Sequence, residues 1–383
     1  MKKIIAILLC LCLFLCSCGK NEAAKEKKEE DFAGMYFSYT ELLGMALSGD
    51  FKERFNEAAD NCKELNVTDM FIHVRAMSDS IYPSAYYPLT DWAKDQNFDV
   101  LAFMIEACHK RNMRFHAWIN PYRISSSVSD LEKISPESPA HSLSHCIGDT
   151  EKGLYFDPSY QEVKRLILDS IREIINRYDV DGIHFDDYFY PTDSPFFDLL
   201  SYNGYCSQTA KPLSLDNFRR ANVNSLISGV KTVLLNADRP VLFSISPAAN
   251  IENNENHLYA DVDYWCRSGF IDAVMPQLYF GFDYPNDHNK FENLLNGWIE
   301  YLSGSDVILY PVLAPYKLDT DQNPDSIEWE NGTDIIARQI KIIKENPFTN
   351  GFALFSYSYV FGEGENYTKQ KENIKKEVKE EKK

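Results

Sequence analysis

Residues 161–186, QEVKRLILDSIREIINRYDVDGIHFD, hold the pattern that decides the fold of this chain. Gln161–Tyr178 repeats apolar side chains at helical spacing, and Gly182–Asp186 is an apolar run of strand length. A helix followed at once by a strand is typical of parallel sheets whose strands are joined by crossover helices.

The unit recurs along most of the chain. Eight segments have the length and composition of strands: Gly34–Tyr39, Val67–Val74, Arg114–Ile119, Gly182–Asp186, Val241–Ser246, Ala273–Leu278, Val307–Val312 and Gly351–Phe355. Seven segments between them have helical periodicity: Lys52–Leu65, Leu101–Arg111, Gln161–Tyr178, Leu215–Asn236, Tyr259–Ser268, Lys290–Leu302 and Asp334–Lys344. This alternation predicts an α/β fold, a single (β/α)8 TIM barrel. An open doubly wound sheet is the weaker alternative, because neither GxGxxG nor GxxxxGK[ST] follows any strand.

The N-terminus carries a different kind of pattern. Met1-Lys2-Lys3 precedes a short apolar run that ends in Leu15-Cys16-Ser17-Cys18, which is typical of a bacterial lipoprotein signal. A simple secretion signal with incidental cysteines is the alternative. We expect four parts: a signal peptide (1–17), lipidated Cys18 with a charged tether (18–31), the barrel domain (32–368), and a charged tail that forms a frayed helix or stays disordered (369–383). The protein would then be a membrane-anchored lipoprotein of the cell envelope, on the periplasmic or surface side.

Composition narrows the classes of partner. The chain has 57 acidic and 39 basic side chains and a net charge of -18, which excludes nucleic-acid binding through bulk charge. Aromatic residues make up 14%, enough to fill a core or to line a sugar-binding groove. Beyond Cys18 the cysteines number five and form no CxxC pair, so a disulfide framework or a zinc site is poorly supported, although one bridge stays open. No metal and no cofactor is expected.

Polar side chains occupy the strand positions that face the barrel axis. Asp186 is the most informative, because an ionised carboxylate on an inward strand position carries a large desolvation cost unless it serves a site. His73, His116 and His184 are each better interpreted as hydrogen-bonded interior histidines. The inward polar and aromatic side chains become more frequent toward the C-terminal ends of the strands, where barrel enzymes hold their active sites.

These side chains suit glycoside hydrolysis, which needs a carboxyl group to protonate the leaving oxygen and a carboxylate to attack or to activate water. We predict Asp186 and Asp187 as the catalytic residues. Neighbours in sequence cannot easily straddle a glycosidic bond, so the second carboxylate is either Asp187, turned at the strand end, or one from another loop: Asp79, Asp157 or Asp283. The predicted substrate-binding residues are Arg75, His116, Asn120, Tyr122, Arg123, His184, Gln277 and Tyr279.

The same residues lie in segments that resemble the bacterial glycosyl-hydrolase-like 10 family. The segments are FIHVRAMSDSIYPSAYYPL (71–89), HAWINPYR (116–123), YFDPSYQEV (155–163), RYDVDGIHFDDYFYP (177–191), SISPA (244–248) and MPQLYF (275–280). The resemblance implies a (β/α)8 barrel in an envelope lipoprotein that hydrolyses a glycan. A related enterobacterial lipoprotein looks like a glycosidase for peptidoglycan strands stripped of their stem peptides. It implies a role for the Asp186–Asp187 pair as the acidic motif.

Two departures from related patterns limit what the resemblance implies. Residues 355–359, FSYSY, contain no acid, whereas the last strand of that relative continues into an acidic loop. Tyr188 stands where a chitinase-like D-G-x-D-x-D-x-E pattern has its glutamate, so a mechanism built on that glutamate is not supported.

The sequence therefore predicts a lipid-anchored, endo-acting glycoside hydrolase whose partners are a glycan and a membrane. Two alternatives stay open. One is a non-catalytic glycan-binding lipoprotein that has lost its acid. The other is a metal-dependent polysaccharide hydrolase or deacetylase built on the three histidines and Asp186, although HExxH is absent, as is the GxSxG of esterases.

Overall fold

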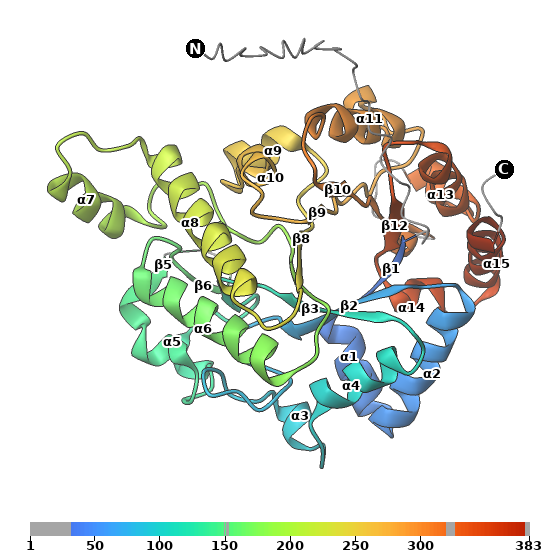
Figure 1. Cartoon of the computed structure of the whole chain (residues 1–383), viewed down its shortest axis with the longest axis horizontal. Helices are drawn as coiled ribbons and strands as arrows, with labels where there is room; N and C mark the ends of the chain where they lie inside the picture. The colour runs from blue at the N-terminus through green and yellow to red at the C-terminus, as the bar shows by residue number, and fades with distance from the viewer. Residues whose placement is uncertain (1–31, 149, 151–152, 319–325, 380–383) are drawn as a thin grey trace, which may run out of the picture. The chain divides into compact units, whose positions relative to one another are not determined.

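The computed structural model describes residues 32–148, 150, 153–318 and 326–379 (Figure 1). The predicted signal, the lipidated Cys18 and the tether lie outside these residues. The main strands are β1 (Phe32–Phe37), β2 (Asp69–Arg75), β3 (Arg114–Ile119), β7 (Gly182–Phe185), β8 (Leu242–Ile245), β9 (Ala273–Val274), β10 (Ile308–Leu309), β11 (Val312–Leu313) and β12 (Gly351–Leu354). The larger helices are α1 (Tyr39–Leu47), α2 (Phe51–Glu64), α4 (Val100–His109), α6 (Gln161–Arg177), α7 (Leu199–Gln208), α8 (Leu215–Leu235), α11 (Phe291–Tyr301), α13 (Ile335–Glu345) and α15 (Glu365–Lys379). Shorter helices are α3 (Asp91–Lys94), α5 (Pro139–Ser142), α9 (Ile251–Asn256), α10 (Val262–Arg267), α12 (Ser326–Trp329) and α14 (Tyr357–Val360).

The strands form one parallel sheet that closes on itself. Its order is β10-β9-β8-β7-β3-β2-β1-β12-β11, so the two edge strands are consecutive pieces of the stretch 308–313. Pro311 separates the pieces, because it has no N–H to give to the ladder. On one side the Tyr310 N–H donates to Val274 O (3.0 Å), and on the other the Ala353 N–H donates to Pro311 O (2.9 Å). The predicted (β/α)8 barrel is confirmed, with its seventh strand divided in two.

Alternation along the strands builds two apolar layers. Ile183 and Phe185 of β7 point outward, into the layer between the sheet and the helices, where the buried stripe of α6 packs. The parity that faces the barrel axis contributes a second, smaller cluster: Phe32, Tyr36, Phe71, Trp118, Met275, Val312 and Ala353. The barrel interior is thus filled with rings beneath its C-terminal end.

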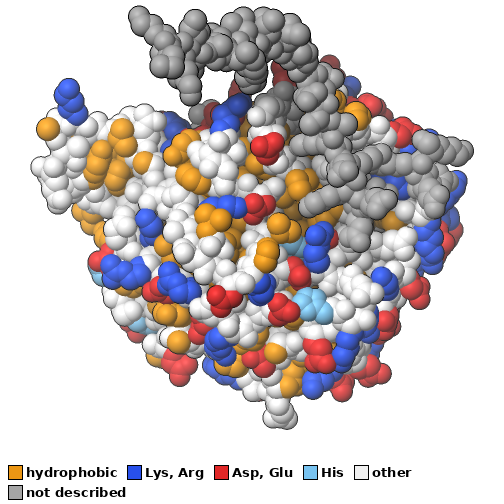
Figure 2. Space-filling model, in the orientation of Figure 1, with side chains coloured by type: hydrophobic (Ala, Val, Ile, Leu, Met, Phe, Trp, Pro, Cys, Tyr) orange, Lys and Arg blue, Asp and Glu red, His pale blue; other side chains and the backbone are white. Residues whose placement is uncertain are grey.

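Two excursions enlarge the C-terminal end of the barrel. After β3 the chain forms a small antiparallel sheet of β4 (Arg123–Ser125), β6 (Leu154–Phe156) and β5 (Ile147–Gly148). After β7 it runs outward to α7, which projects from the barrel in Figure 1 and carries exposed apolar side chains such as Leu200. Orange side chains gather on the left of Figure 2, where α7 lies. A buried ion pair ties this second excursion to α8: Arg219 donates to Asp198 through Nε (2.8 Å) and Nη2 (2.5 Å).

The C-terminal segment is helical. Residues 369–379, for which the composition predicts a frayed helix or disorder, belong to α15, which begins at Glu365. Gln370 and Ile374 are fully buried, so the charge-rich helix has an inward face that its composition hides. It provides the eighth main helix of the barrel. No described helix is long and apolar enough to cross a membrane.

We expect the Arg219–Asp198 pair to be the strongest polar restraint on the α7 excursion. Asp198→Ala leaves a fully buried guanidinium without its carboxylate and should lower the free energy of unfolding by about 3–5 kcal/mol. Leu200→Ala in the same excursion is the control, since an 83% exposed side chain should change stability by less than about 0.5 kcal/mol. Urea unfolding followed by tryptophan fluorescence measures both. Equal midpoints for the two variants would contradict the assignment.

Candidate active site

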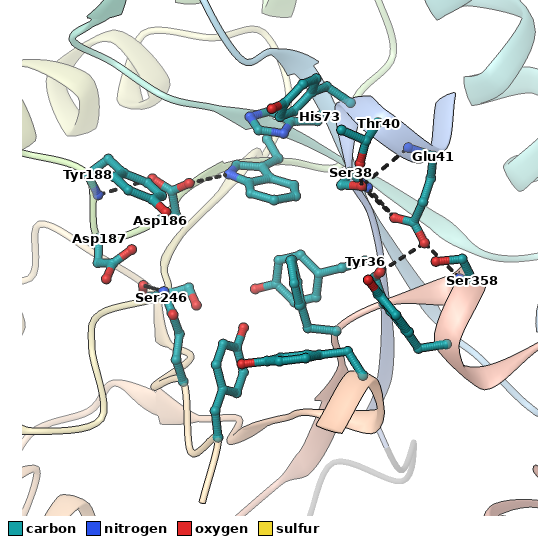
Figure 3. Close-up of a pocket in the computed structure, with 18 of the residues that line it drawn as sticks. Tyr36, Ser38, Thr40, Glu41, His73, Asp186, Asp187, Tyr188, Ser246 and Ser358 are labelled. Atoms are coloured by element: carbon teal, nitrogen blue, oxygen red, sulfur yellow. Dashed lines mark hydrogen bonds between the residues drawn. The ribbon is translucent and has the colours of Figure 1, made fainter. Parts of the chain in front are cut away.

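A cleft of about 500 Å³ opens at the C-terminal ends of the barrel strands (Figure 3). Every sheet position contributes to its wall, from the residues after β1 to those after β12. The lining side chains are Tyr36, Ser38, Tyr39, Thr40, Glu41, His73, Trp118, Arg123, Asp186, Asp187, Tyr188, Ser246, Gln277, Tyr279, Tyr316, Phe355, Ser356, Ser358 and Tyr359. The barrel thus brings together residues from its first to its last strand.

Asp186 follows β7 directly and is held as a hydrogen-bond acceptor. Its Oδ2 accepts from Trp118 Nε1 (3.1 Å) and from the Asn120 amide, and its Oδ1 accepts from the Tyr188 N–H (3.2 Å). Burial raises the pKa of this carboxyl, while the Arg123 charge and the three donors lower it. Donors on both oxygens favour the ionised form of Asp186 over that of its neighbour.

Asp187 faces the same cleft from the turn that ends β7. Burial raises the pKa of Asp187 to about 7, and the negative charge of Asp186 adds to the increase. Contact with Gln277 and the charge of Arg123 oppose this shift. The pair is therefore unequal: the three donors stabilise the charge of Asp186, and that charge in turn opposes the ionisation of Asp187.

A hydrogen-bond chain fixes the orientation of Asp186. Asn120 is fully buried, and its amide nitrogen donates to Asp186 while its oxygen accepts from Arg123 Nη2 (2.6 Å) and from His73 Nε2 (2.5 Å). Burial, followed by the Arg123 charge, holds the pKa of His73 well below its usual range, so the ring is neutral. The His73 ring stacks on Trp118 at 3.7 Å, which orients the second donor to Asp186.

The floor of the cleft is aromatic. Tyr36 meets Trp118 edge to face at 5.4 Å, and Phe355 lies 5.8 Å from both Tyr36 and Tyr279. Three rings of the cleft lining remain partly exposed: Tyr188 is 46% exposed, Tyr359 40% and Tyr39 37%. Such rings can stack on the apolar faces of sugars.

Glu41 lies across the cleft from the Asp186–Asp187 pair (Figure 3). Its Oε2 accepts from the N–H (2.7 Å) and the hydroxyl (2.8 Å) of Ser38, forming the capping box of α1. Its Oε1 accepts from the Ser356 hydroxyl (2.8 Å) and the Ser358 N–H (2.7 Å). The segment after the last strand contains no acid, but Glu41 from the first βα unit places a carboxylate against it.

The predicted site residues fall into three groups. Asp186, Asp187, Arg123, Gln277 and Tyr279 line the cleft, and Asn120 lies directly behind it. The remaining four do not line it: Arg75, His116, Tyr122 and His184.

Those four side chains are engaged inside the barrel or its outer layer. His116 binds Asp69, the first residue of β2 (2.6 Å), and so lies toward the N-terminal end of the barrel. His184 binds the Tyr36 hydroxyl (2.9 Å) and Ser244 (2.8 Å) beneath the floor. Arg75 lies over the Tyr87 ring, and Tyr122 packs in the core. An axis-facing side chain lines the cleft only if it lies at the C-terminal end of its strand.

The alternative carboxylates are not in the cleft lining. Asp157 accepts from the Ser201 hydroxyl (2.6 Å) and the Ser159 N–H (2.8 Å). Burial raises the pKa of Asp79 to about 6, away from the cleft, and Asp283 is exposed. No cluster of three or more His, Cys, Asp or Glu side chains suited to a metal ion occurs in the described part of the chain.

Sequence reasoning did not find Glu41, Tyr36, Tyr316 or Ser246 as lining residues. A signal existed for Glu41, because Ser38-Tyr39-Thr40-Glu41 is a capping box immediately after a strand. For the other three no local pattern distinguishes a ring or hydroxyl of the floor from one in the core.

Comparison with known proteins agrees with this geometry. The family model described as "Glycosyl hydrolase-like 10" matches residues 37–330. The chain is 30% identical over 328 residues to "Glycosyl hydrolase YngK" of Bacillus subtilis (strain 168), covering 80% of this chain and only 63% of that protein's length. It is 26% identical over 413 residues to "Glycosyl hydrolase DigH" of Escherichia coli (strain K12), covering 93% of this chain and 92% of that protein.

Solved structures show the same fold at low sequence identity. The PgaB (BpsB) glycoside hydrolase domain from Bordetella bronchiseptica superposes with a TM-score of 0.58 at 12% identity, over 89% of this chain and 98% of that one. An α-L-fucosidase, isoenzyme 2, from Paenibacillus thiaminolyticus also gives 0.58 at 12% identity, over 91% of this chain and 49% of that one. The chain therefore belongs to the glycosyl hydrolase-like 10 family, and its domain has the TIM-barrel fold of these glycoside hydrolases.

Proposed function

We propose that this protein hydrolyses the glycan strands of cell-envelope peptidoglycan, preferring strands that lack stem peptides, while a lipid on Cys18 holds it at a membrane. The observation that carries the enzymatic part is the carboxyl pair at the end of β7: Asp186 accepts hydrogen bonds on both oxygens, and the pKa of Asp187 beside it is raised to about 7, in an open cleft. The lipoprotein-type N-terminus and the family resemblance support the envelope location and the glycan.

The pair divides the work of glycosidic cleavage. Asp187 holds the proton that the leaving oxygen needs, at a pKa suited to proton transfer near pH 7. Asp186 supplies a fixed negative charge next to the carbon that becomes positive as the bond breaks. The donors from Trp118 and Asn120 keep Asp186 from turning toward Asp187 and sharing its proton.

Recognition of the glycan relies on short-range contacts. The whole chain is acidic, so it has no bulk attraction for an anionic wall, and added salt should change affinity little. Within the cleft lining Arg123 carries the positive charge, and its guanidinium lies 4.8 Å above the Tyr188 ring. Partly exposed rings in the lining suit a strand that runs through the cleft, which supports endo action.

The first test replaces each carboxyl group by an amide. Asp186→Asn and Asp187→Asn should each lower kcat on peptidoglycan strands lacking stem peptides by about 10²–10⁴-fold, because the first removes the negative charge that stabilises the reacting carbon and the second removes the proton donor. Asp287→Asn, an exposed acid far along the chain, is the matched control and should retain activity. Release of shortened strands is followed by chromatography, with stem-peptide-bearing strands and plant polysaccharides in parallel. Binding without cleavage by the unmodified protein would instead support a non-catalytic glycan-binding protein.

The second test uses pH. Since Asp187 must be protonated to donate, kcat should fall about tenfold per pH unit above its pKa of about 7. A rate profile between pH 5 and 10 on the same strands measures the limb. A kcat that stays constant to pH 9 would show that another group donates the proton.

The third test measures how burial of the Asp187 carboxyl group affects the stability of the protein. The pKa of Asp187 is about 7 in the folded protein and about 3.9 in an unfolded chain, so folding takes up a proton between these values and stability falls as pH rises through that window. Asp187→Asn is neutral throughout and should be more stable than the unmodified protein at pH 8, by roughly 4 kcal/mol, with the difference vanishing toward pH 4. Urea unfolding at pH 4.5, 6 and 8 measures this. A difference independent of pH would contradict it.

A further inference from the structure

The position of the carboxyl pair leaves one face of the sugar without an attacking group. Asp186 and Asp187 are consecutive residues at the end of one strand and lie on one side of the cleft (Figure 3). A protein nucleophile and a proton donor must approach the anomeric carbon and the leaving oxygen from different sides, about 5 Å apart. Asp186 and Asp187 leave the same turn and lie on the same side of the cleft, so both approach a bound sugar from that side (Figure 3).

Glu41, the carboxylate on the opposite wall of the described cleft, is already fully engaged. Each of its oxygens accepts two hydrogen bonds of 2.7–2.8 Å, from Ser38 on one side and from Ser356 and Ser358 on the other. Forming a bond to carbon would strip these donors of their acceptor and uncap α1. Glu41 therefore serves to hold the wall together.

The cleft next to Asp186 is lined by the three kinds of group that can bind an acetamido group. Ring faces and edges bound it: Tyr36, Trp118, Tyr279 and Phe355 stand within 5.4–6.2 Å of one another in neighbouring pairs. Such a floor accepts a methyl group, the hydroxyls of Tyr36 and Ser246 lie in the same lining, and Asp186 offers an anchored carboxylate to an N–H. An apolar methyl, a carbonyl oxygen and an N–H are the three parts of an acetamido group.

We propose that the nucleophile is the carbonyl oxygen of the substrate's own 2-acetamido group, so that the site takes N-acetylated amino sugars. This inference rests on the proposed glycosidase function. As the bond from C1 to the leaving oxygen breaks, Asp187 gives that oxygen its proton and the acetamido oxygen bonds to C1, forming an oxazolinium ion. Asp186 accepts the hydrogen bond of the acetamido N–H and balances the positive charge.

The second half of the reaction restores both partners. A water molecule attacks C1 from the side that the leaving group vacated and gives one proton to the Asp187 carboxylate. The C1–O bond of the oxazolinium opens and the acetamido group is regenerated. Two displacements at C1 give a product with the starting configuration. Sugars with a free amine or a hydroxyl at C2 lack the carbonyl and are not cleaved.

The experiment changes the nucleophile and leaves the protein intact. Peptidoglycan strands lacking stem peptides are de-N-acetylated and then re-acylated with either acetyl or trifluoroacetyl groups. The trifluoroacetyl group has nearly the same size, and its carbonyl oxygen is a far weaker nucleophile. We expect kcat to fall about 100-fold or more on the trifluoroacetyl strands while KM changes by less than about threefold, and the re-acetylated strands to recover the original rate.

The outcomes separate this inference from the proposed function. Comparable kcat on both acylated forms, or a product of inverted configuration by NMR, would overturn the acetamido mechanism and leave the glycosidase function standing. If the original N-acetylated strands are not cleaved at all, the proposed function fails, and the inference fails with it.

Discussion

The burial of two carboxyl groups next to each other at the end of β7 is the constraint on which the barrel mouth depends. Desolvation raises the pKa of both carboxyl groups, and the negative charge of Asp186 raises that of Asp187 further. The Arg123 charge and the donors Trp118 and Asn120 lower the pKa of Asp186 and so stabilise its negative charge. Each of these lies at the end of β3 or in the small sheet that follows it, which explains why that excursion packs against the end of β7.

Closure of the barrel brings the residues that surround the carboxyl pair together. A parallel sheet that ended at β10 and β11 would present open edges, and the residues after β1 and β12 would not face those after β7. Because 308–313 pairs on both sides, the strand ends form a ring and their loops converge. Pro311, which interrupts that strand, is tolerated because the carbonyl groups and N–H groups around it continue the ladder.

The sequence predicts the fold well because the helix–strand unit is repeated and each unit carries its own periodicity. The packing of a segment is less evident where tertiary contacts override composition, as in α15, whose charged sequence conceals the buried Ile374. Asp186 and His184 both face the barrel axis as predicted, yet depth along the axis decides their role: Asp186 reaches the cleft, whereas His184, two residues earlier, binds groups beneath it. The alternation also predicts that Arg75 faces the axis, but the register shifts at this point of β2 and its side chain lies over Tyr87 instead. Glu41 shows the other limit, since its partners Ser356 and Ser358 are specified only by the closed barrel.

The contacts of Glu41 also set the order in which the cleft can be assembled. Its partners lie 315 and 317 residues further along the chain, so the wall opposite the carboxyl pair does not exist until the last strand has been made and docked. A chain still emerging from the ribosome has its β7 carboxyl groups but lacks the wall that faces them. The candidate active site is therefore assembled only when the barrel closes, and a nascent or truncated copy does not have it.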